Sequence, residues 1–234
     1  MSKEFFDAIQ QGNLGEVRRL LSHEPSLIHE RNEDGLSPVM LAAYRRKRDI
    51  LEFLCENAGV LNIFEAAASG RTRLALRHIA RDPSLANAYA SDGFQPLGLA
   101  CFLGYYETAE RLIQVGAMVN SPSRNEEGLT PIHLAAAAGN ADIVLLLLEH
   151  GANPSARESH GLTPLHLAAQ NGDVKTLHTL LFNGADMSIC CNQGKLPLDL
   201  AIEAGHTQAA DLLRQGITRR FKTPRLSNAA TLTK

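Results

Sequence analysis

The sequence predicts an all-α protein in which pairs of short helices repeat and stack as a solenoid. The segment GLTPIHLAAAAGNADIVLLLLEHGAN at residues 128–153 recurs 33 residues later as GLTPLHLAAQNGDVKTLHTLLFNGAD, and a fixed period of this size indicates a repeat architecture. Each copy also carries the start and stop signals of two helices. Helices shorter than about 12 residues are marginal in water, so we expect neighbouring units to stabilise each other.

The unit that begins at Gly128 shows how each helix pair is specified. Thr130 suits an N-cap and Pro131 the first helical position, where a missing N–H costs nothing. The first helix is expected to stop near Gly139. The second is expected to end at Gly151 and to bury one face, formed by Ile143, Val144, Leu147 and Leu148.

The glycine spacing extends the pattern to most of the chain. Gly128, Gly161 and Gly194 are 33 residues apart, Gly93 lies 35 before the first, and Gly35 lies 58 before Gly93, which is 33 plus 25. EFFDAIQQG at residues 4–12 also recurs as NIFEAAASG at residues 62–70, which indicates duplication of a two-unit block. We therefore divide the chain into seven units, about 3–34, 35–59, 60–92, 93–127, 128–160, 161–193 and 194–217.

Composition and charge narrow the functional classes. Hydrophobic residues make up 44% of the 234 and the formal charge is −2, so the total charge implies no nucleic-acid-binding field. Residues 218–234 form a basic tail that reads as disordered. The chain opens on polar residues, has four cysteines and contains no aliphatic run longer than six, so we expect a cytoplasmic protein without a membrane span.

The pattern G-x-TPLHLAA-x-x-G, a leucine-rich helix and G-A-(D/N) resembles the ankyrin repeat, and the wording DPSLANAYASDGFQPLGLACFLG resembles prokaryotic-type ankyrin-repeat-domain proteins. The resemblance implies an ankyrin-repeat solenoid of helix-turn-helix units with hairpin-like fingers. It also implies that a protein partner binds along the fingers and inner helices. Carried onto this sequence, the partner-binding residues are Tyr89, Ser91, Asp92, Phe94, Phe102, Leu103, Arg124, Glu126, Leu129, Arg157, His160, Leu162, Gln170 and Asn171.

Three departures from the repeat predict local differences. Unit two runs almost directly into NIFEAAASG, so its following finger is missing and the groove should be interrupted near residues 59–64. The SPSRNEE segment after Asn120 is two residues longer than the period allows, so that finger should bulge. Arg46 replaces the glycine that separates the two helices of the other units.

No motif in the sequence predicts a catalytic, cofactor or metal site. His133 and His166 occupy the position of the ankyrin histidine, which resemblance assigns to hydrogen bonding within and between repeats, and neither has a carboxylate or metal-ligand partner at a recognised spacing. The adjacent Cys190 and Cys191 lack a CxxC arrangement and read as an incidental pair. The aromatic group around Tyr89, Phe94 and Phe102 could anchor a partner or pack between units, and both interpretations stay open.

These observations predict a monomeric, non-enzymatic scaffold that binds an unidentified protein through its concave finger and inner-helix surface. Two alternatives remain. The basic tail could bind nucleic acid or an anionic surface, with nucleic acid the less favoured because aromatic residues are not interleaved with the charges. A small molecule could instead bind at the interrupted junction between units two and three.

Overall fold

The structure is a computed structural model that describes residues 1–222, with side chains placed through residue 216. The helices of this described part follow in chain order: α1 (Ser2–Gln11), α2 (Leu14–His23), α3 (Pro38–Tyr44), α4 (Arg48–Asn57), α5 (Ile63–Ala68), α6 (Thr72–Arg81), α7 (Pro96–Leu103), α8 (Tyr106–Gln114), α9 (Pro131–Ala137), α10 (Ala141–Glu149), α11 (Pro164–Gln170), α12 (Val174–Phe182), α13 (Pro197–Glu203) and α14 (Thr207–Lys222). Two 3₁₀ turns, η1 (Pro25–His29) and η2 (Pro83–Asn87), follow α2 and α6.

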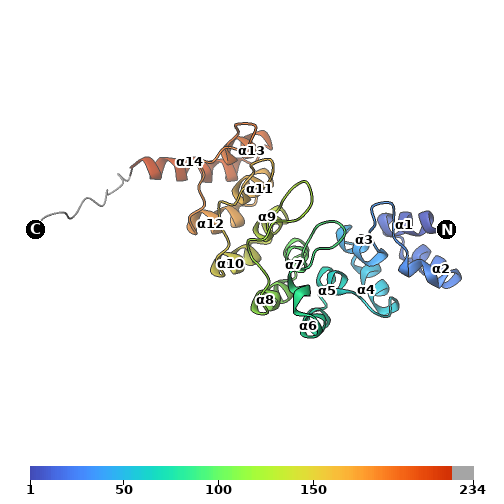
Figure 1. Ribbon diagram of the computed structural model, residues 1–234. Helices are drawn as coiled ribbons and strands as arrows, with labels where there is room; N and C mark the ends of the chain where they lie inside the picture. Colours follow the sequence, from blue (N-terminus) through green and yellow to red (C-terminus); the bar gives the residue numbers. More distant parts are fainter. Residues whose placement is uncertain (223–234) are drawn as a thin grey trace, which may run out of the picture.

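The helix pairs follow one another in a curved row from the N-terminus to α14 (Figure 1). The odd-numbered helices from α5 to α13 pack against each other as an inner layer, and the even-numbered helices from α6 to α14 form the outer layer. The predicted all-α solenoid of helix pairs is confirmed.

The helix boundaries follow the predicted signals. Proline begins α3, α7, α9, α11 and α13, where the first residue needs no backbone donor. The turn between the two helices of a pair requires a left-handed residue, and in most units a glycine such as Gly104 (φ 84°) supplies it. Arg46 occupies this position in unit two with φ 52°, the one non-glycine residue with positive φ among those described.

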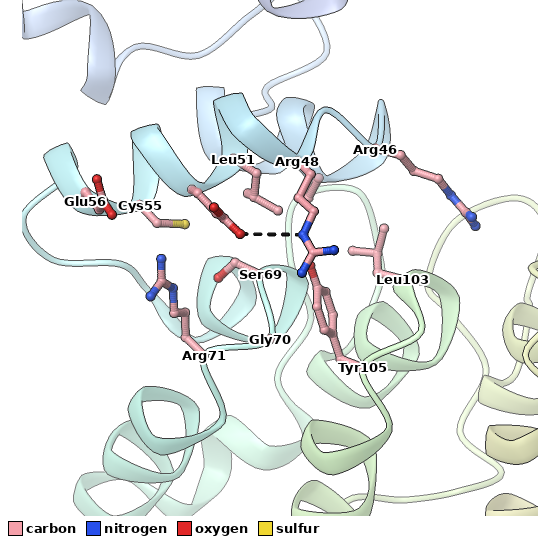
Figure 2. Close-up of a pocket in the computed structure, with 12 residues that line it drawn as sticks. Arg46, Arg48, Leu51, Cys55, Glu56, Ser69, Gly70, Arg71, Leu103 and Tyr105 are labelled. Atoms are coloured by element: carbon pink, nitrogen blue, oxygen red, sulfur yellow. Dashed lines mark ion pairs between the residues drawn. The ribbon is translucent and has the colours of Figure 1, made fainter. Parts of the chain in front are cut away.

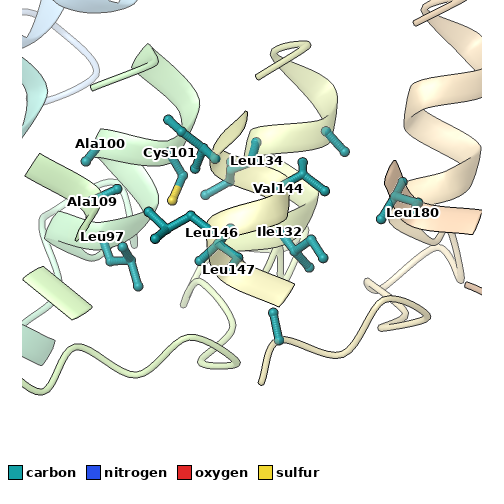
Figure 3. Close-up of a cluster of buried hydrophobic side chains, with 14 of the residues drawn as sticks. Leu97, Ala100, Cys101, Ala109, Ile132, Leu134, Val144, Leu146, Leu147 and Leu180 are labelled. Carbon is teal, nitrogen blue, oxygen red and sulfur yellow. The ribbon is translucent and has the colours of Figure 1, made fainter. Parts of the chain in front are cut away.

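The hydrophobic core is divided at the junction of units two and three. From α5 onward the buried side chains form one continuous cluster, which includes the fully buried Leu97, Ile132 and Leu147 (Figure 3). The buried side chains of α1 to α4 belong to a second cluster around Phe5, Leu54 and their neighbours. Beyond the junction this cluster includes the buried Ala68 and Leu99 and packs against the partly buried Phe64, Leu74, Phe94 and Leu103. The inner helices of both clusters meet there, with α3 packing on α5 less extensively than α5 on α7.

The connections bear out two of the predicted departures. Only residues 58–62 join α4 to α5, so no finger lies between them. The finger before α9 is closed by a hydrogen bond from the Ser123 N–H to the Leu129 carbonyl, whereas the next finger is closed from Glu158 to Leu162. The two additional residues therefore lie within the turn of the finger and widen it.

One helix pair lies in each of the seven units, with α1 beginning at Ser2, one residue before the boundary given for unit one. The last helix continues to Lys222, five residues past the predicted boundary at 217, so the tail assigned to residues 218–234 begins inside α14. Residues 223–234, which hold the rest of that tail, lie outside the described residues.

Candidate partner-binding surface

Five fingers project from the helix pairs, and we number each by the unit that it opens. They are finger two (residues 31–36), finger four (89–94), finger five (123–129), finger six (157–162) and finger seven (190–195). Each is closed by a backbone hydrogen bond across its turn, as from the Asn32 N–H to the Leu36 carbonyl and from the Ala90 N–H to the Phe94 carbonyl. The described fingers thus share one closing hydrogen bond, which spans two more residues in finger five than in the others.

A cavity of about 400 Å³ lies between fingers four and five and the inner helices. Its lining is mostly apolar and includes Tyr44, Phe94, Phe102 and Leu129, with Glu127 as its one ionisable carboxylate. The rings of Tyr44 and Phe102 meet edge to face with centroids 6.4 Å apart. We call this cavity the aromatic cavity.

A direct hydrogen bond between Tyr44 of unit two and Asp92 of finger four fixes one wall of the aromatic cavity. The Tyr44 hydroxyl donates to the Asp92 carboxylate at 2.5 Å, and the other oxygen of Asp92 accepts from the Phe94 N–H at 3.2 Å. Burial and the neighbouring carboxylate raise the pKa of Tyr44 far above its ordinary value. The phenol therefore stays protonated and continues to donate.

Tyr89, predicted as an anchor, is already held by the next unit. Its hydroxyl lies 3.0 Å from the Ser121 hydroxyl and donates to the Pro122 carbonyl at 3.2 Å. The Arg124 guanidinium stacks over its ring at 4.0 Å from the centroid. These contacts place Tyr89 and Arg124 together as a cation–π pair at the base of fingers four and five, outside the aromatic cavity.

The remaining predicted residues are spread along the solenoid. Ser91 and Glu126 are exposed on their fingers, and Leu103 faces a different cavity, beside α4. In unit six, Arg157 donates to the Cys190 carbonyl, the exposed His160 pairs with the buried Glu158 at 3.0 Å, and Leu162 is half-buried. Gln170 and Asn171 are exposed at the end of α11, with Asn171 bonded to the Ala137 carbonyl.

Of the predicted residues, Phe94, Phe102 and Leu129 lie together at the aromatic cavity, where Tyr44, which was not in that set, joins them. Tyr44 lies at the end of α3 as Phe102 and Leu103 lie at the end of α7, so its place in unit two is equivalent to theirs in unit four. Nothing in the period indicated that unit two would contact unit four, because the missing finger brings together units that normally have another finger between them.

The two buried histidines are structural, as predicted. The Nδ1 atom of His133 accepts from the Thr130 hydroxyl at 2.8 Å, and its Nε2 lies 3.0 Å from the Ala156 carbonyl and 3.2 Å from that of Leu162. Because carbonyls only accept, Nε2 carries the proton. His166 repeats the arrangement with Thr163 and the Lys195 carbonyl. Burial lowers the pKa of both imidazoles, opposed by the carbonyl hydrogen bonds.

Two further cavities flank the interrupted junction. One, of about 600 Å³, lies between α4, the turn from α5 to α6 and the turn from α7 to α8. Figure 2 shows Arg48 and Arg71 beside this space with the hydroxyls of Ser69 and Tyr105, while Arg46 points away. Arg48 forms an exposed ion pair with Glu52 at 3.5 Å. The other cavity, of about 340 Å³, lies on the finger side between fingers two and four.

Cysteine and metal chemistry adds no site in the described part of the chain. All four cysteines are free, and burial raises the pKa of the Cys101 thiol strongly and that of Cys55 to a lesser degree. No cluster of three or more His, Cys, Asp or Glu side chains with the geometry of a metal site occurs among residues 1–216.

None of the helices described has the length and apolar character needed to cross a bilayer.

Comparison with known proteins gives the same architecture. A family model described as "Ankyrin repeats (many copies)" matches residues 112–168, and one described as "Ankyrin repeats (3 copies)" matches residues 154–220. Together they cover the chain from α8 into α14. Units one to three lie outside these matches, but there the structure shows the same helix pairs.

Three curated proteins illustrate the likeness. The chain is 41% identical over 71 residues to the ankyrin repeat and KH domain-containing protein mask of Drosophila melanogaster, 30% of this chain and 2% of that protein. It is 32% identical over 129 residues to a putative ankyrin repeat protein of Fowlpox virus, and this alignment covers 50% of this chain and 38% of that protein. It is 28% identical over 157 residues to the target of rapamycin complex 2 subunit AVO2 of Saccharomyces cerevisiae, and this alignment covers 62% of this chain and 36% of that protein.

The alignments therefore span well under half the length of these relatives, two of which carry the ankyrin repeat in their names. The helix pairs, the glycine turns, the histidine network and the family matches agree. Ankyrin repeats therefore occupy residues 112–220 of the chain, and the described residues fold as an all-α solenoid of helix pairs.

Proposed function

We propose that the chain is a non-enzymatic scaffold that binds a protein partner on its finger and inner-helix surface, with the aromatic cavity as the principal anchor site. Ankyrin repeats generally mediate protein–protein interactions, so the class of ligand follows from the repeat. The position of the anchor is our inference from the cavity between fingers four and five.

The observation that carries the proposal is the combination of an apolar lining with open access from the groove. Phe94, Phe102, Tyr44 and Leu129 are each only half-buried, so the cavity leaves their apolar surface in contact with water. Burying one leucine- or phenylalanine-sized side chain there would contribute about 1.5–3 kcal/mol. A few such desolvated anchors commonly supply most of the affinity of an interface.

The rim of the aromatic cavity indicates the neighbouring chemistry of the partner. Glu127 lies at the cavity and Glu126 beside it is exposed, and neither is paired in an ion pair among the described residues. A partner segment with an apolar side chain followed closely by lysine or arginine would fit both features. The exposed residues of units five and six, among them Arg157, His160, Gln170 and Asn171, would form the polar part of the interface.

The experiment is affinity capture with three baits: the intact chain, Phe102→Ala and Phe182→Ala. Phe182 provides the matched control, because its side chain is 92% exposed at the end of α12 and lies outside the aromatic cavity. The proposal expects a protein that the intact and Phe182→Ala chains retain and the Phe102→Ala chain loses, with circular dichroism unchanged. Equal retention by all three would remove the aromatic cavity from the interface.

Compartment and oligomeric state belong to the same proposal. Four free cysteines suit a reducing compartment, so we infer a cytoplasmic scaffold. We also infer a monomer, whose mass by light scattering would stay near 25.4 kDa across concentrations.

A second candidate function is the binding of a small anion in the 600 Å³ cavity at the interrupted junction. The observation that favours it is the approach of Arg48 and Arg71 to one space lined also by Ser69 and Tyr105. Glu52 and Glu56 line the same cavity and oppose an anion. Inorganic phosphate or pyrophosphate should raise the melting temperature of the intact chain and not of Arg71→Gln; no difference between the two chains would exclude this site.

A further inference from the structure

Successive fingers are tied together by one backbone hydrogen bond each. The Ser159 N–H of finger six donates to the Glu127 carbonyl of finger five at 3.0 Å, and the Asn192 N–H of finger seven donates to the His160 carbonyl of finger six at 2.9 Å. The Arg124 N–H of finger five donates to the Gly93 carbonyl of finger four at 2.9 Å. A short backbone ladder therefore runs from finger four to finger seven.

The ladder is broken where unit three lacks its finger. Ser91 lies two residues before Gly93, as Ser159 and Asn192 lie two residues before their repeat glycines. Yet within residues 1–222 its N–H has no hydrogen-bond partner. On the other side of the break, Asp34 directly precedes Gly35, just as the ladder acceptors Glu127 and His160 directly precede their repeat glycines. The Asp34 carbonyl accepts no hydrogen bond from any described residue.

Ser91 lines one wall of a cavity, and Gly35, whose nitrogen is bonded to the Asp34 carbonyl carbon, lies on the opposite wall. The cavity of about 340 Å³ on the finger side is lined by Arg31, Gly35 and Leu36 of finger two and by residues 89–92 of finger four. Its floor comes from the starts of α3 and α5 and includes Met40 and Phe64. The space is the position that the finger of unit three would occupy, and we call it the vacant finger site.

The floor of the vacant finger site contains no side chain that needs a hydrogen-bond partner on a following finger. Met40 is the third residue of α3, as His133 is of α9 and His166 of α11. Each histidine donates its Nε2–H to carbonyls of the finger that follows. No finger follows α3, so a buried histidine there would lack an acceptor, and the apolar thioether needs none.

We propose that the vacant finger site binds a turn-forming loop of a partner protein, and that this loop completes the ladder in place of the missing finger. The carbonyl of the incoming segment accepts from the Ser91 N–H, and one of its N–H groups donates to the Asp34 carbonyl. An apolar side chain of the segment rests on Met40 and Phe64. A backbone N–H on one wall and a backbone carbonyl at the edge of the facing wall, both without a partner among the described residues, select a peptide backbone, as exposed sheet edges do in strand addition.

This inference rests on the proposed function in one respect, that the ligand is a protein. The vacant finger site and the aromatic cavity meet at Asp92, which lines the first and holds Tyr44 of the second. A partner segment placed between fingers two and four could therefore continue into the aromatic cavity along one groove.

The test uses the chain's own finger six as a probe. A cyclised peptide of residues 153–163, NPSARESHGLT, carries the turn that completes the ladder between fingers five and seven. Cyclisation lowers the entropy lost on binding. Hydrogen exchange of the full chain is measured by nuclear magnetic resonance with and without about 1 mM peptide.

The proposal expects the Ser91 amide proton to exchange more slowly with peptide, by about tenfold when the peptide is at ten times its Kd. The Ser159 amide, already bonded, should not change. No slowing at Ser91 at this peptide concentration would overturn the proposal.

A grafted variant provides the matched control. Inserting an eight-residue finger sequence between Gly59 and Val60 restores the 33-residue unit, since unit two is 25 residues long. In the grafted variant the Ser91 amide proton should exchange slowly even without peptide, and added peptide should not slow it further. If peptide still slows Ser91 exchange in the grafted variant, the assignment of the site is contradicted. Phe102→Ala should leave the peptide effect intact, so failure of the aromatic cavity and failure of the vacant finger site give different results.

Discussion

The junction between units five and six and the junction between units two and three join the same kind of helix pair in different ways. At the first, His133 caps α9 and bonds the backbone of finger six. At the second, no finger exists, Met40 takes the histidine's place, and the Ser37 hydroxyl donates to Glu65 of the next unit at 2.6 Å instead. Glu65 also closes a capping box with Asn62.

The packing differs between the two junctions as well. The outer helices α10 and α12 pack closely, whereas α4 and α6 hardly touch, and a cavity of about 600 Å³ opens beside α4. The buried side chains form one cluster on one side of the interrupted junction and another on the other side. The comparison teaches that a finger does more than offer a binding surface: it also fixes how the next outer helix stacks.

The largest effect is expected from removing a core side chain in the regular part of the array. Leu147 is fully buried between α10 and its neighbours, so Leu147→Ala should lower the free energy of unfolding by about 2–5 kcal/mol. Urea denaturation followed by circular dichroism measures the change. Leu145→Ala on the same helix, at a 40% exposed position, is the control and should cost far less.

The histidine and methionine positions can be exchanged to test the comparison directly. His133→Met should cost about 1–3 kcal/mol, because the Thr130 hydroxyl and the carbonyls of Ala156 and Leu162 lose a buried partner. Met40→Leu, which keeps an apolar side chain over the vacant finger site, should cost less than about 1.5 kcal/mol. An equal cost for the two changes in urea denaturation would mean that His133 contributes only its volume.

The same histidines make stability depend on pH. Burial holds the pKa of His133 and His166 below the unfolded value of about 6.5, so the unfolded chain takes up protons first. The stability that the two neutral histidines contribute to the folded chain is complete above about pH 6.5, and it is lost as the pH falls through their folded-state pKa. Urea midpoints at about pH 7.5 and pH 5.5 should therefore differ less in the His133→Gln, His166→Gln double variant than in the intact chain.

The smallest effect concerns the turn between α3 and α4. Arg46 has φ 52°, where a side chain is strained and glycine is not, so Arg46→Gly should raise the free energy of unfolding by less than about 1 kcal/mol. Gly104→Ala, the reverse change at φ 84° in unit four, should lower it by about 1 kcal/mol. A destabilised Arg46→Gly would show that the contact of Arg46 with the Phe102 ring outweighs the backbone strain.

The helices could be predicted because their signals are local. Prolines at the first helical position, N-caps such as Thr130 and the recurring glycines are read within a few residues of each boundary. The wide turn of finger five was predictable for the same reason, from two additional residues in a fixed period. The end of α14 at Lys222 was missed because the predicted boundary follows Gly216, which lies inside the helix, whereas Pro224 is the proline that follows its end.

The aromatic cavity could be predicted only in part. Phe94, Phe102 and Leu129 belong to adjacent units, and the period places adjacent units side by side. Tyr44 comes from two units away, and its bond to Asp92 depends on how the chain stacks across the missing finger. That geometry is set by the packing of α3 on α5, which no local sequence signal encodes. Tyr89 illustrates the converse case, because its aromatic character was evident but its stacking with Arg124 was not.

The measurement that tests the account most directly is native-state hydrogen exchange of the intact chain and of the chain with a finger grafted between Gly59 and Val60. If the missing finger weakens the junction, amides of α1 to α4 open at a lower free energy than those of α7 to α12 in the intact chain. The graft should bring the two groups closer together. A single opening free energy for all these helices, or a difference that the graft leaves unchanged, would contradict the account.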